Sequence, residues 1–337
     1  MAARMQRGTE LPADPSAVWV VTDGRAGNLR QAAALATALG VDTARNWTLD
    51  ARAPWRWASP RRLPGARQAF GAPFARALAT PPSLAIGCGR QAALATRLLR
   101  EAGARTVQVL DPRLDPAHWD LVVVPRHDAL RGDNVIRLTG SLHPVDDLWL
   151  AQGRRDHPAL GQQPRPRIVL LAGGTSAHVA VDDAAFGALV DALEAVCLRE
   201  GGSLLATTSR RTPEAWKQRL RASRGAVPGL RWTGGEVEGD PARNPYPGLL
   251  AWADRIVCTP DSVNMLSEAA ATAAPLFIAW PDRQRGRPRG FIDTLVKSGR
   301  ARALDPAAGP LQIEPFPVDP LRETSRVAAE VRARLGL

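Results

Sequence analysis

Short apolar runs alternate with helical segments along most of the chain. In the first half, such runs predict strands at residues 18–22, 83–88, 106–110, 120–125 and 134–138. Two of these runs are followed, after short loops, by helical segments at residues 31–39 and 91–100, an alternation that is typical of a parallel α/β sheet. The first half is therefore predicted to be a Rossmann-like domain over residues 18–150.

The second half of the chain restarts the same pattern. Apolar runs beginning at Arg167 and Ser203 flank an amphipathic helix expected over residues 183–200, and further strands are predicted at 255–259 and 276–280. A second Rossmann-like domain is therefore expected over residues 167–319, so that the fold class is α/β with two such domains.

Two segments lie outside these domains. Residues 151–166 are rich in glycine and proline and lack apolar periodicity, which predicts an interdomain linker. A closing helix is expected over about residues 321–335, within the last segment 320–337; one interpretation packs it back on the N-terminal domain.

Composition is that of a soluble globular protein. The 337 residues are 45% hydrophobic and 23% charged, with no apolar run long enough to span a membrane. The 44 Lys and Arg residues exceed the 33 Asp and Glu residues, a net charge of +11. The arginine bias is typical of a GC-rich genome, while the functional alternative is a field that attracts phosphates, acidic lipid or nucleic acid. Because the basic residues are scattered rather than massed in one tail, no nucleic-acid partner is predicted.

Cysteine usage and the N-terminus bear on localisation. Cys88, Cys197 and Cys258 are far apart in apolar surroundings and are interpreted as buried free thiols of a reducing compartment. Residues 1–17 contain basic and acidic residues but no apolar core, which predicts a disordered leader rather than a signal peptide. The protein is expected to be cytoplasmic, with peripheral contact on the cytoplasmic membrane face as an open alternative.

Residues 255–281 organise the chemistry of the second half. They predict a strand, a sharp turn at Pro260, a helix from about Ser262 and a second strand. Asp261 or Ser262 can cap the first helical N–H groups. The helix start would then lie at the carboxyl end of a strand, where α/β folds hold anionic ligands. Glu268 stands on this helix among small and apolar residues.

Two loops of the first half carry candidate catalytic groups. Gly24 and Gly27 follow the first strand, where glycines let backbone approach a ligand, and Asp23 at the strand end is a candidate catalytic or hydrogen-bonding group. An ordinary turn is an equally good account of this loop. His127 and Asp128 follow the fourth strand and could act as a general base near neutral pH, whereas a solvated loop is the commoner case.

Glycines and hydroxyls also follow two strands of the second half. Gly173, Gly174 and Thr175 end one strand, and the next ends in hydroxyls beside Arg210 and Arg211. Short donors and bidentate cations are what a diphosphate requires. The alternative is a solvated turn with fortuitous arginines.

Residues 47–82 are rich in tryptophan, proline and arginine and predict a long loop with short helices. Their aromatic residues could form a docking surface, but a satellite core beneath an irregular loop is the favoured account.

The chain resembles the bacterial and plant family named for mitochondrial fission, the "elongated mitochondria" family, over nearly its whole length. The segments that carry this resemblance are Thr22–Gln31, Val124–Asp128, Leu171–Gly174, Thr207–Pro213, Asn244–Tyr246 and Thr259–Ala269. Asn28 departs from the pattern, since histidine is expected there in many relatives, and this weakens any role of position 28 as a base.

The resemblance implies the glycosyltransferase-B (GT-B) architecture, in which two Rossmann-like domains face each other across a cleft. The stretch around Ser262 is similar to the sugar-nucleotide loop of the lipid-linked N-acetylglucosaminyl transferase of peptidoglycan synthesis. By this resemblance Glu268 would bind the ribose hydroxyls, and N–H groups near Ser262 and Val263 would meet the diphosphate. The predicted binding residues are Gly24, Gly27, Gly173, Gly174, Thr175, Ser209, Arg210, Arg211, Asp261, Ser262, Val263, Met265 and Glu268.

The function predicted on this basis is transfer of a sugar from a nucleoside diphosphate sugar to an acceptor that is unknown and could be membrane-associated. Asp23, His127 and Asp128 are the candidate bases, and no metal or other cofactor is expected. A sugar-nucleotide epimerase of the same architecture is the nearest enzymatic alternative. The plant members imply a different class, a non-catalytic platform for protein recruitment. Fold alone does not decide between these.

Overall fold

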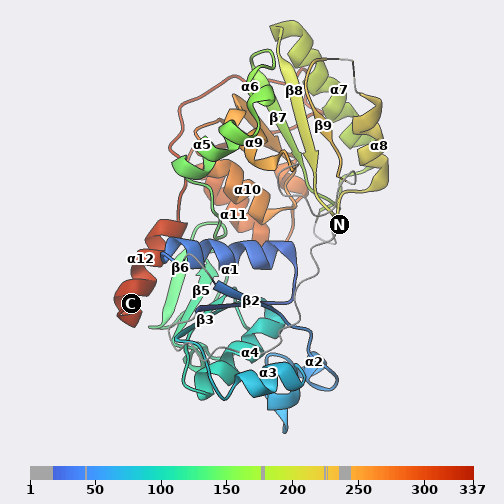
Figure 1. Ribbon diagram of the computed structural model, residues 1–337. Coiled ribbons are helices and arrows are strands. Elements are labelled where there is room, and N and C mark those ends of the chain that lie inside the picture. The colour runs from blue at the N-terminus through green and yellow to red at the C-terminus, as the bar shows by residue number, and fades with distance from the viewer. Residues whose placement is uncertain (1–17, 42–43, 176–178, 224, 226, 235–243) are drawn as a thin grey trace. The chain divides into compact units, whose positions relative to one another are not determined.

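The computed structural model describes residues 18–41, 44–175, 179–223, 225, 227–234 and 244–337 (Figure 1). The predicted leader, residues 1–17, lies outside the described part. The chain divides into two compact units. The N-terminal unit runs to Pro144 and also takes in Glu323–Leu337, and the C-terminal unit comprises Val145–Arg322.

The N-terminal unit is built on a parallel six-stranded sheet in the order β2-β1-β3-β4-β5-β6. Its strands are β1 (Val18–Thr22), β2 (Ala44–Thr48), β3 (Leu84–Cys88), β4 (Arg105–Val109), β5 (Leu121–Pro125) and β6 (Val135–Leu138). Helices α1 (Ala26–Ala38) and α12 (Thr324–Leu335) share one apolar cluster with the sheet, and α3 (Ala72–Ala77) and α4 (Arg90–Glu101) share another on the opposite face (Figure 1). The closing helix thus belongs to the N-terminal unit.

The five strands predicted for the first half are present, and no predicted end differs from the observed one by more than one residue. The sequence missed β2, because this edge strand has the mixed sequence Ala-Arg-Asn-Trp-Thr and is half-exposed along its length. The aromatic segment contributes a satellite core, as favoured. Trp47 lies 5.3 Å from Trp19 and 5.6 Å from Phe74, ring centre to ring centre.

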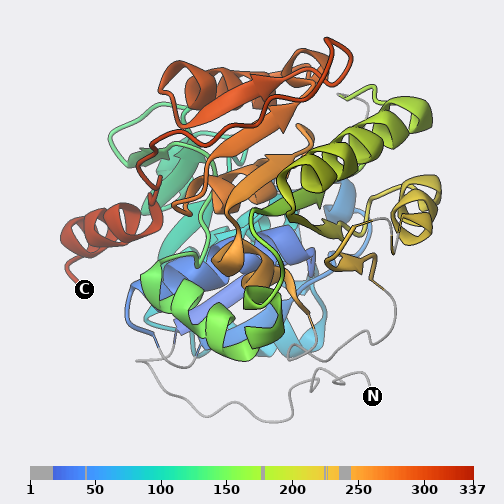
Figure 2. The same ribbon diagram turned by 90° about the horizontal axis from the view of Figure 1, so that it is seen from above.

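The C-terminal unit has a second parallel sheet, in the order β12-β11-β10-β7-β8-β9. Its strands are β7 (Arg167–Ala172), β8 (Ser203–Thr208), β9 (Arg231–Trp232), β10 (Arg255–Cys258), β11 (Leu276–Ala279) and β12 (Ala301–Leu304). Its helices are α5 (Asp147–Asp156), α6 (Pro158–Gly161), α7 (Asp183–Glu200), α8 (Glu214–Ala222), α9 (Tyr246–Trp252), α10 (Val263–Ala270) and α11 (Arg287–Lys297). Helices α7 and α8 cover one face of the sheet, and the others pack on the opposite face (Figure 2).

The predicted linker at residues 151–166 is wrong. These residues form the end of α5 and all of α6, and Leu160 packs into the same apolar cluster as helix α9. Gly153 permits close packing rather than flexibility, because a Cβ there would lie 2.7 Å from the carbonyl oxygen of Pro247. Pro158 occupies the first turn of α6, where a proline costs no helical hydrogen bond. The division between the units falls at Pro144 instead.

Each sheet has one point at which the strand order reverses. In the N-terminal unit the chain passes from β1 to β2 on one side and continues with β3 on the other. In the C-terminal unit β7, β8 and β9 extend one way, and β10, β11 and β12 extend the other. Ligands of open parallel sheets bind beyond the carboxyl ends of the strands at such switch points. The pairs β1/β3 and β7/β10 therefore mark where a binding site is expected.

All three cysteines are buried and unpaired, as predicted. Of the helices in the described ranges, none combines the length and the apolar character that a membrane span requires.

Candidate functional site

The loops at the β7/β10 switch point are joined by hydrogen bonds. The backbone N–H of Gly173 donates to Thr259 Oγ1 at 2.7 Å, and that of Gly174 donates to Asp261 Oδ2 at 2.7 Å. The Thr259 hydroxyl in turn donates to Asp261 Oδ1 at 2.8 Å. The loops after β7 and β10, two of the candidate ligand loops that the sequence marked, are therefore joined through the side chains of Thr259 and Asp261.

Asp261 is the centre of this arrangement. Its side chain is 1% exposed, and Arg211 Nη2 lies 3.1 Å from Oδ2, although the Arg211 side chain as a whole is 55% exposed. Burial raises the pKa of Asp261, and the hydrogen bonds from Gly174 and Thr259 and the charge of Arg211 oppose that rise. Asp261 with its partners Gly173, Gly174, Thr259 and Arg211 is called the Asp261 clamp below.

The clamp explains why two glycines follow β7. A Cβ at position 173 would lie 2.0 Å from Asp261 Oδ1, and one at position 174 would lie 2.4 Å from the carbonyl oxygen of Arg211. The glycine pair was predicted to line an anion site. In the structure its two N–H groups donate to the side chains of Thr259 and Asp261. The glycines therefore allow the neighbouring loops to pack closely against the end of β7.

The turn after β8 is ordered by its own hydroxyls. Thr212 Oγ1 accepts from the Ser209 N–H at 2.9 Å and donates to the carbonyl oxygen of Ala172 at 3.1 Å, which ties the turn to the end of β7. Ser209 Oγ accepts from the Arg211 N–H at 3.2 Å. Arg210 and Arg211 are both exposed on this turn. The sequence identified the turn but not the bridging role of Thr212.

Helix α10 begins as predicted. Ser262 is its N-cap, and its Oγ accepts from the Met265 N–H at 3.4 Å. Asp261, the other candidate cap, belongs to the clamp instead. The side chain of Met265 packs into the apolar cluster of the C-terminal unit, which differs from the binding role predicted for it. Val263 is half-buried at the first position of the helix.

Glu268 lies inside the unit. It is 2% exposed, and its Oε2 accepts a hydrogen bond from the hydroxyl of Tyr246, which starts helix α9. The sequence raised the question of what this carboxylate faces, and the tyrosine is one answer. Tyr246 is the chain's only tyrosine and stands in an Asn-Pro-Tyr segment, a signal that could have suggested the pairing.

A second constellation lies at the β1/β3 switch point. Asp23 Oδ1 accepts from Asn28 Nδ2 at 2.9 Å and from the Arg25 N–H at 3.1 Å, while Arg25 Nε lies 3.4 Å from Oδ2. The Asp23 side chain is 14% exposed. Gly89, after β3, closes on this pair, since a Cβ there would lie 2.5 Å from Asn28 Nδ2. Asn28, discounted as a base, is thus a fixed partner of Asp23.

The remaining predicted residues of this unit lie apart from each other or in turns. Gly24 adopts a φ of +78°, which suits glycine, and Gly27 lies in the first turn of α1. His127 and Asp128 are half-buried in the turn after β5. Strands β3 and β4 separate β1 from β5, so the two strand ends are about 14 Å apart at about 4.8 Å per strand. Asp23 and His127 therefore do not form one catalytic pair.

Thr175 is exposed just beyond Gly174 at the β7/β10 switch point. With Ser209, Arg210, Arg211 and Ser262, it completes the set of polar residues that two strand ends, one turn and a helix start contribute to this edge of the sheet.

The solved structures that resemble the chain share its architecture. A UDP-N-acetylglucosamine 2-epimerase is 13% identical with a TM-score of 0.52, and the match covers 95% of this chain and 96% of that one. The UDP-N-acetylglucosamine 2-epimerase of Rickettsia bellii is 10% identical with a TM-score of 0.51, with 96% of each chain covered. At these identities the likeness establishes the fold, which is two Rossmann-like domains of the GT-B type.

Two relatives match in sequence. The Mitochondrial fission protein ELM1 of Arabidopsis thaliana is 28% identical over 283 residues, covering 76% of this chain. The chain spans 64% of the length of that relative. An uncharacterized protein of Rickettsia prowazekii (strain Madrid E) is 23% identical over 369 residues, covering 95% of this chain and 99% of its own length.

The family model described as Mitochondrial fission ELM1 matches residues 26–335, which include the β7/β10 switch point, the Asp261 clamp and helix α12. The chain therefore belongs to the Mitochondrial fission ELM1 family.

Proposed function

We propose that the C-terminal unit binds a nucleoside diphosphate sugar at the β7/β10 switch point and that the protein is a glycosyltransferase of the GT-B type. The observation that carries this proposal is the convergence of two exposed arginines, two hydroxyl-bearing turns and the start of helix α10 at this one edge. A helix start and guanidinium groups are the usual partners of phosphate oxygens.

The Asp261 clamp supports this proposal by preorganising Arg211. The guanidinium is anchored on one side to a carboxylate that is 1% exposed, while 55% of its side chain faces solvent. A cation held in this way loses little conformational entropy when a diphosphate approaches. Arg210, exposed beside it, adds the second positive charge. Leaving-group charge on a diphosphate would be stabilised by both arginines.

Glu268 is proposed to meet the ribose through one carboxylate oxygen. Tyr246 already donates to Oε2, so a ribose hydroxyl would share a carboxylate whose orientation is fixed. Because Glu268 is buried, this contact requires the side chains over it to move when the nucleotide binds.

In the N-terminal unit, Asp23 is the favoured base for the acceptor hydroxyl. A base must come within hydrogen-bond reach of the proton that it removes. The Asp23 carboxylate meets this requirement because it is partly exposed and is oriented by Asn28. His127 and Asp128, in the turn after β5, are the alternative.

The ligand to test first is suggested by the names of the two similar structures, both UDP-N-acetylglucosamine 2-epimerases. We therefore choose UDP and UDP-N-acetylglucosamine as probes and measure binding to the full chain by titration calorimetry. Arg210→Ala and Arg211→Ala should each weaken binding of UDP by about tenfold, because each loses one charge-assisted contact with phosphate. Arg155→Ala, an exposed arginine on α5, is the matched control and should bind as the unaltered chain does.

Glu268→Gln tests the ribose contact with the shape of the side chain preserved. It should weaken UDP binding but leave the binding of inorganic diphosphate unchanged. If no nucleoside diphosphate binds at millimolar concentration, the donor site is refuted. If the Arg155→Ala control weakens binding as much as the two site variants, the contact is nonspecific and the assigned site is wrong.

The reaction is distinguished from its alternatives by the fate of the sugar. Transfer or slow hydrolysis releases UDP, which chromatography detects, whereas epimerisation changes the sugar's proton NMR spectrum without release of UDP. A third outcome, a non-catalytic platform, also fits the name of the family. Binding of nucleotide without release of UDP or epimerisation, with any acceptor offered, would support that reading against transfer.

A further inference from the structure

The positive charge of the chain is concentrated in one part of the N-terminal unit. Residues 51–100 contain nine arginines, no lysine and no acidic residue, so this stretch contributes +9 to a net charge of +11. At the average density of 33 acidic residues in 337, about five would be expected in a stretch of that length. A codon bias towards arginine does not account for the missing acids, so the concentration of charge is a separate feature.

The most exposed part of this stretch is a closed loop, residues 52–69, called the Trp57 loop below. Its ends meet where the Arg52 N–H donates to the carbonyl oxygen of Ala69 at 2.8 Å. Ala69 and Ala66 are buried against the satellite core, and Trp55 Nε1 donates to the carbonyl oxygen of Pro64 at 3.1 Å. The loop therefore has an inner side that packs on the unit and an outer side that does not.

Two arginines of α4 hold the loop from within. Arg90 donates to the carbonyl oxygens of Trp57 and Ser59, and Arg97 Nη1 donates to that of Pro60 at 2.7 Å. The backbone around α2 (Trp55–Ala58) is thus tied to a buried helix. The side chains of this loop are therefore exposed although the backbone that carries them is held by hydrogen bonds.

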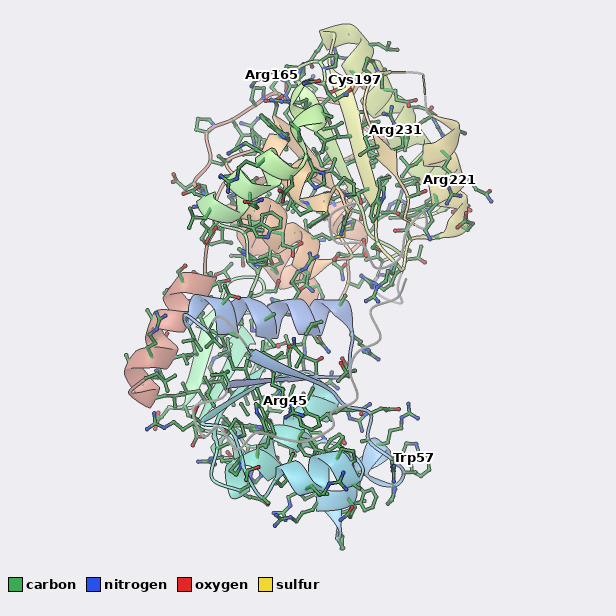
Figure 3. All side chains as sticks on the ribbon, in the orientation of Figure 1. Arg45, Trp57, Arg165, Cys197, Arg221 and Arg231 are labelled. Atoms are coloured by element: carbon green, nitrogen blue, oxygen red, sulfur yellow. The ribbon has the colours of Figure 1, made fainter. Side chains whose placement is uncertain are left out.

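Trp57 lies on the outer side. The residue is 74% exposed, and its side chain points away from the unit, as Figure 3 shows. The backbone of Trp57 is anchored, yet its ring faces solvent and leaves apolar surface uncovered. Neighbouring residues of the same loop are buried against the unit. Such a ring is typical of a contact with another apolar phase.

The arginines of the loop are also exposed, and only some are neutralised. Arg56 lies 3.4 Å from Asp50, and Arg62 pairs with Glu101, the two acids that bound the acid-free stretch. Among the residues that the structure describes, no carboxylate lies within 4.0 Å of the guanidinium groups of Arg52, Arg61 or Arg67. Residues 62–68, which include Arg62 and Arg67, line an open hollow.

We propose that the Trp57 loop docks the N-terminal unit on an anionic lipid bilayer, with Trp57 at the level of the headgroups and Arg61 and Arg67 against lipid phosphates. Tryptophan prefers the membrane–water interface because its ring is apolar and its N–H is polar. Clustered arginines are attracted to the negative surface potential of acidic lipids. The exposed ring supplies the apolar contribution to peripheral membrane binding, and the arginines without a carboxylate partner supply the electrostatic one.

A bilayer fits this loop better than a nucleic acid does. Proteins that bind single strands without sequence preference line a basic groove with several aromatic rings on which successive bases stack. Here Trp55 is engaged with Pro64, Phe70 and Phe74 pack in the satellite core, and Trp57 is the large aromatic residue that the loop exposes. This proposal does not depend on the nucleotide site of the C-terminal unit.

The test is co-sedimentation of the full chain with vesicles of phosphatidylcholine alone and with about 30% phosphatidylglycerol. Binding is expected only to the acidic vesicles and should fall steeply between about 50 and 500 mM salt. Trp57→Ala should weaken partitioning by about tenfold, and the double variant Arg61→Ala with Arg67→Ala by about thirtyfold.

Matched controls come from α5 in the C-terminal unit. Leu148→Ala removes an apolar side chain that is 80% exposed, and Arg155→Ala removes an exposed arginine, so both should bind acidic vesicles as the unaltered chain does. Circular dichroism of each variant separates a loss of docking from a loss of folding.

A second measurement places the contact on the loop. Since all three native cysteines are buried, a thiol-reactive fluorophore should label Pro64→Cys selectively. Its emission should shift to shorter wavelength on addition of acidic vesicles, whereas the same label on Leu148→Cys should not respond.

Three results would overturn the proposal: no binding to acidic vesicles at low salt, equal binding by the Arg61 and Arg67 double variant, or no response of the label at position 64. Binding of a single-stranded oligonucleotide that the double variant loses, with vesicles ignored, would assign the loop to nucleic acid instead.

Discussion

Each switch point has an aspartate beside a glycine loop, Asp23 after β1 and Asp261 after β10, and the two carboxylates differ in surroundings. Asp23 receives its hydrogen bonds from the segment that directly follows it, from the Arg25 N–H and from Asn28 in the first turn of α1, and its side chain is 14% exposed. Asp261 is contacted from the loop after β7, from the turn after β8 and from its own strand end, and its side chain is 1% exposed.

This difference suits Asp261 to holding loops together and Asp23 to accepting a proton from a substrate. A carboxylate whose acceptors are filled by donors from three loops holds those loops together, and burial makes each of its bonds costly to lose. A carboxylate held from one side keeps room for a substrate proton. An aspartate at a switch point can thus have either role, and the number of segments that converge on the acid decides between them.

The largest effect should come from removing the clamp acid. Asp261→Ala leaves the Gly174 N–H, the Thr259 hydroxyl and Arg211 without their partner, and should cost about 3 kcal/mol or more of unfolding free energy. Asp23→Ala should cost less than about 1 kcal/mol, because its partners reach water. Urea unfolding of both variants measures the contrast, and equal losses would show that the two acids do not differ in the way described.

The next effect concerns the glycine that admits the Arg211 backbone. Gly174→Ala would place a Cβ 2.4 Å from the carbonyl oxygen of Arg211, and the forced shift of backbone should cost about 2 to 3 kcal/mol. The control is Gly187→Ala on helix α7, whose Cβ has nothing nearer than 4.0 Å, where the gain in helix propensity should stabilise by about 0.5 to 1 kcal/mol. Chemical denaturation resolves the opposite signs, and a mild Gly174 variant would mean that the clamp is easily deformed.

Turnover should show the reverse dependence on the two acids. If Asp23 is the base, Asp23→Asn should lower kcat by about a hundredfold with little change in folding, since a proton acceptor is lost while the shape is kept. Asn28→Ala should lower kcat by about tenfold by freeing the carboxylate to rotate. Unchanged turnover of both would exclude this constellation and leave the turn with His127 and Asp128 as the candidate.

The smallest effect is a pair of opposite pH dependences at the two ends of β10. Burial alone would raise the pKa of Asp254, but hydrogen bonds from Arg167 and Arg165 outweigh it and hold the pKa below its ordinary value of 3.8. Asp254 therefore adds stability above that value, and this stability is lost as the pH falls through the folded-state pKa. Burial raises the pKa of Asp261 above 3.8, so its ionisation costs stability that is absent below 3.8 and grows as the pH rises.

The measurement is the unfolding free energy between about pH 2 and 6. Asp254→Asn should reduce the fall in unfolding free energy that the unaltered chain shows as the pH is lowered. Asp261→Asn should instead remove a contribution to the unfolding free energy that decreases as the pH rises. Two variants with slopes of the same sign would contradict the assigned surroundings of one of these carboxylates.

Much of the fold was predictable because apolar runs of strand length report burial on both faces of a parallel sheet. The strands around Val20 and Leu170, the cap at Ser262 and the satellite core near Trp47 followed from local pattern. The edge strand β2 escaped because a half-exposed strand lacks that signal. The linker prediction failed because Gly153 and Pro158 were judged as breakers, although one permits close packing and the other starts a helix.

The candidate site was predictable only as a set of loops. Sequence pattern brought out Gly173, Arg211 and Asp261 as separate candidates but could not state that the acid accepts from the N–H groups and pairs with the arginine. It noticed Tyr246 without linking it to Glu268, 22 residues along the chain. It also counted the net positive charge without noticing that residues 51–100 hold nine arginines and no acidic residue.

By itself the sequence determined the order and type of most elements and the residues available at each strand end, because these depend on the local period of apolar side chains. Only the tertiary structure decided which of those residues meet. Whether a carboxylate is enclosed, as Asp261 is, or accessible, as Asp23 is, depends on how many distant segments converge on it, and no local pattern carries that information.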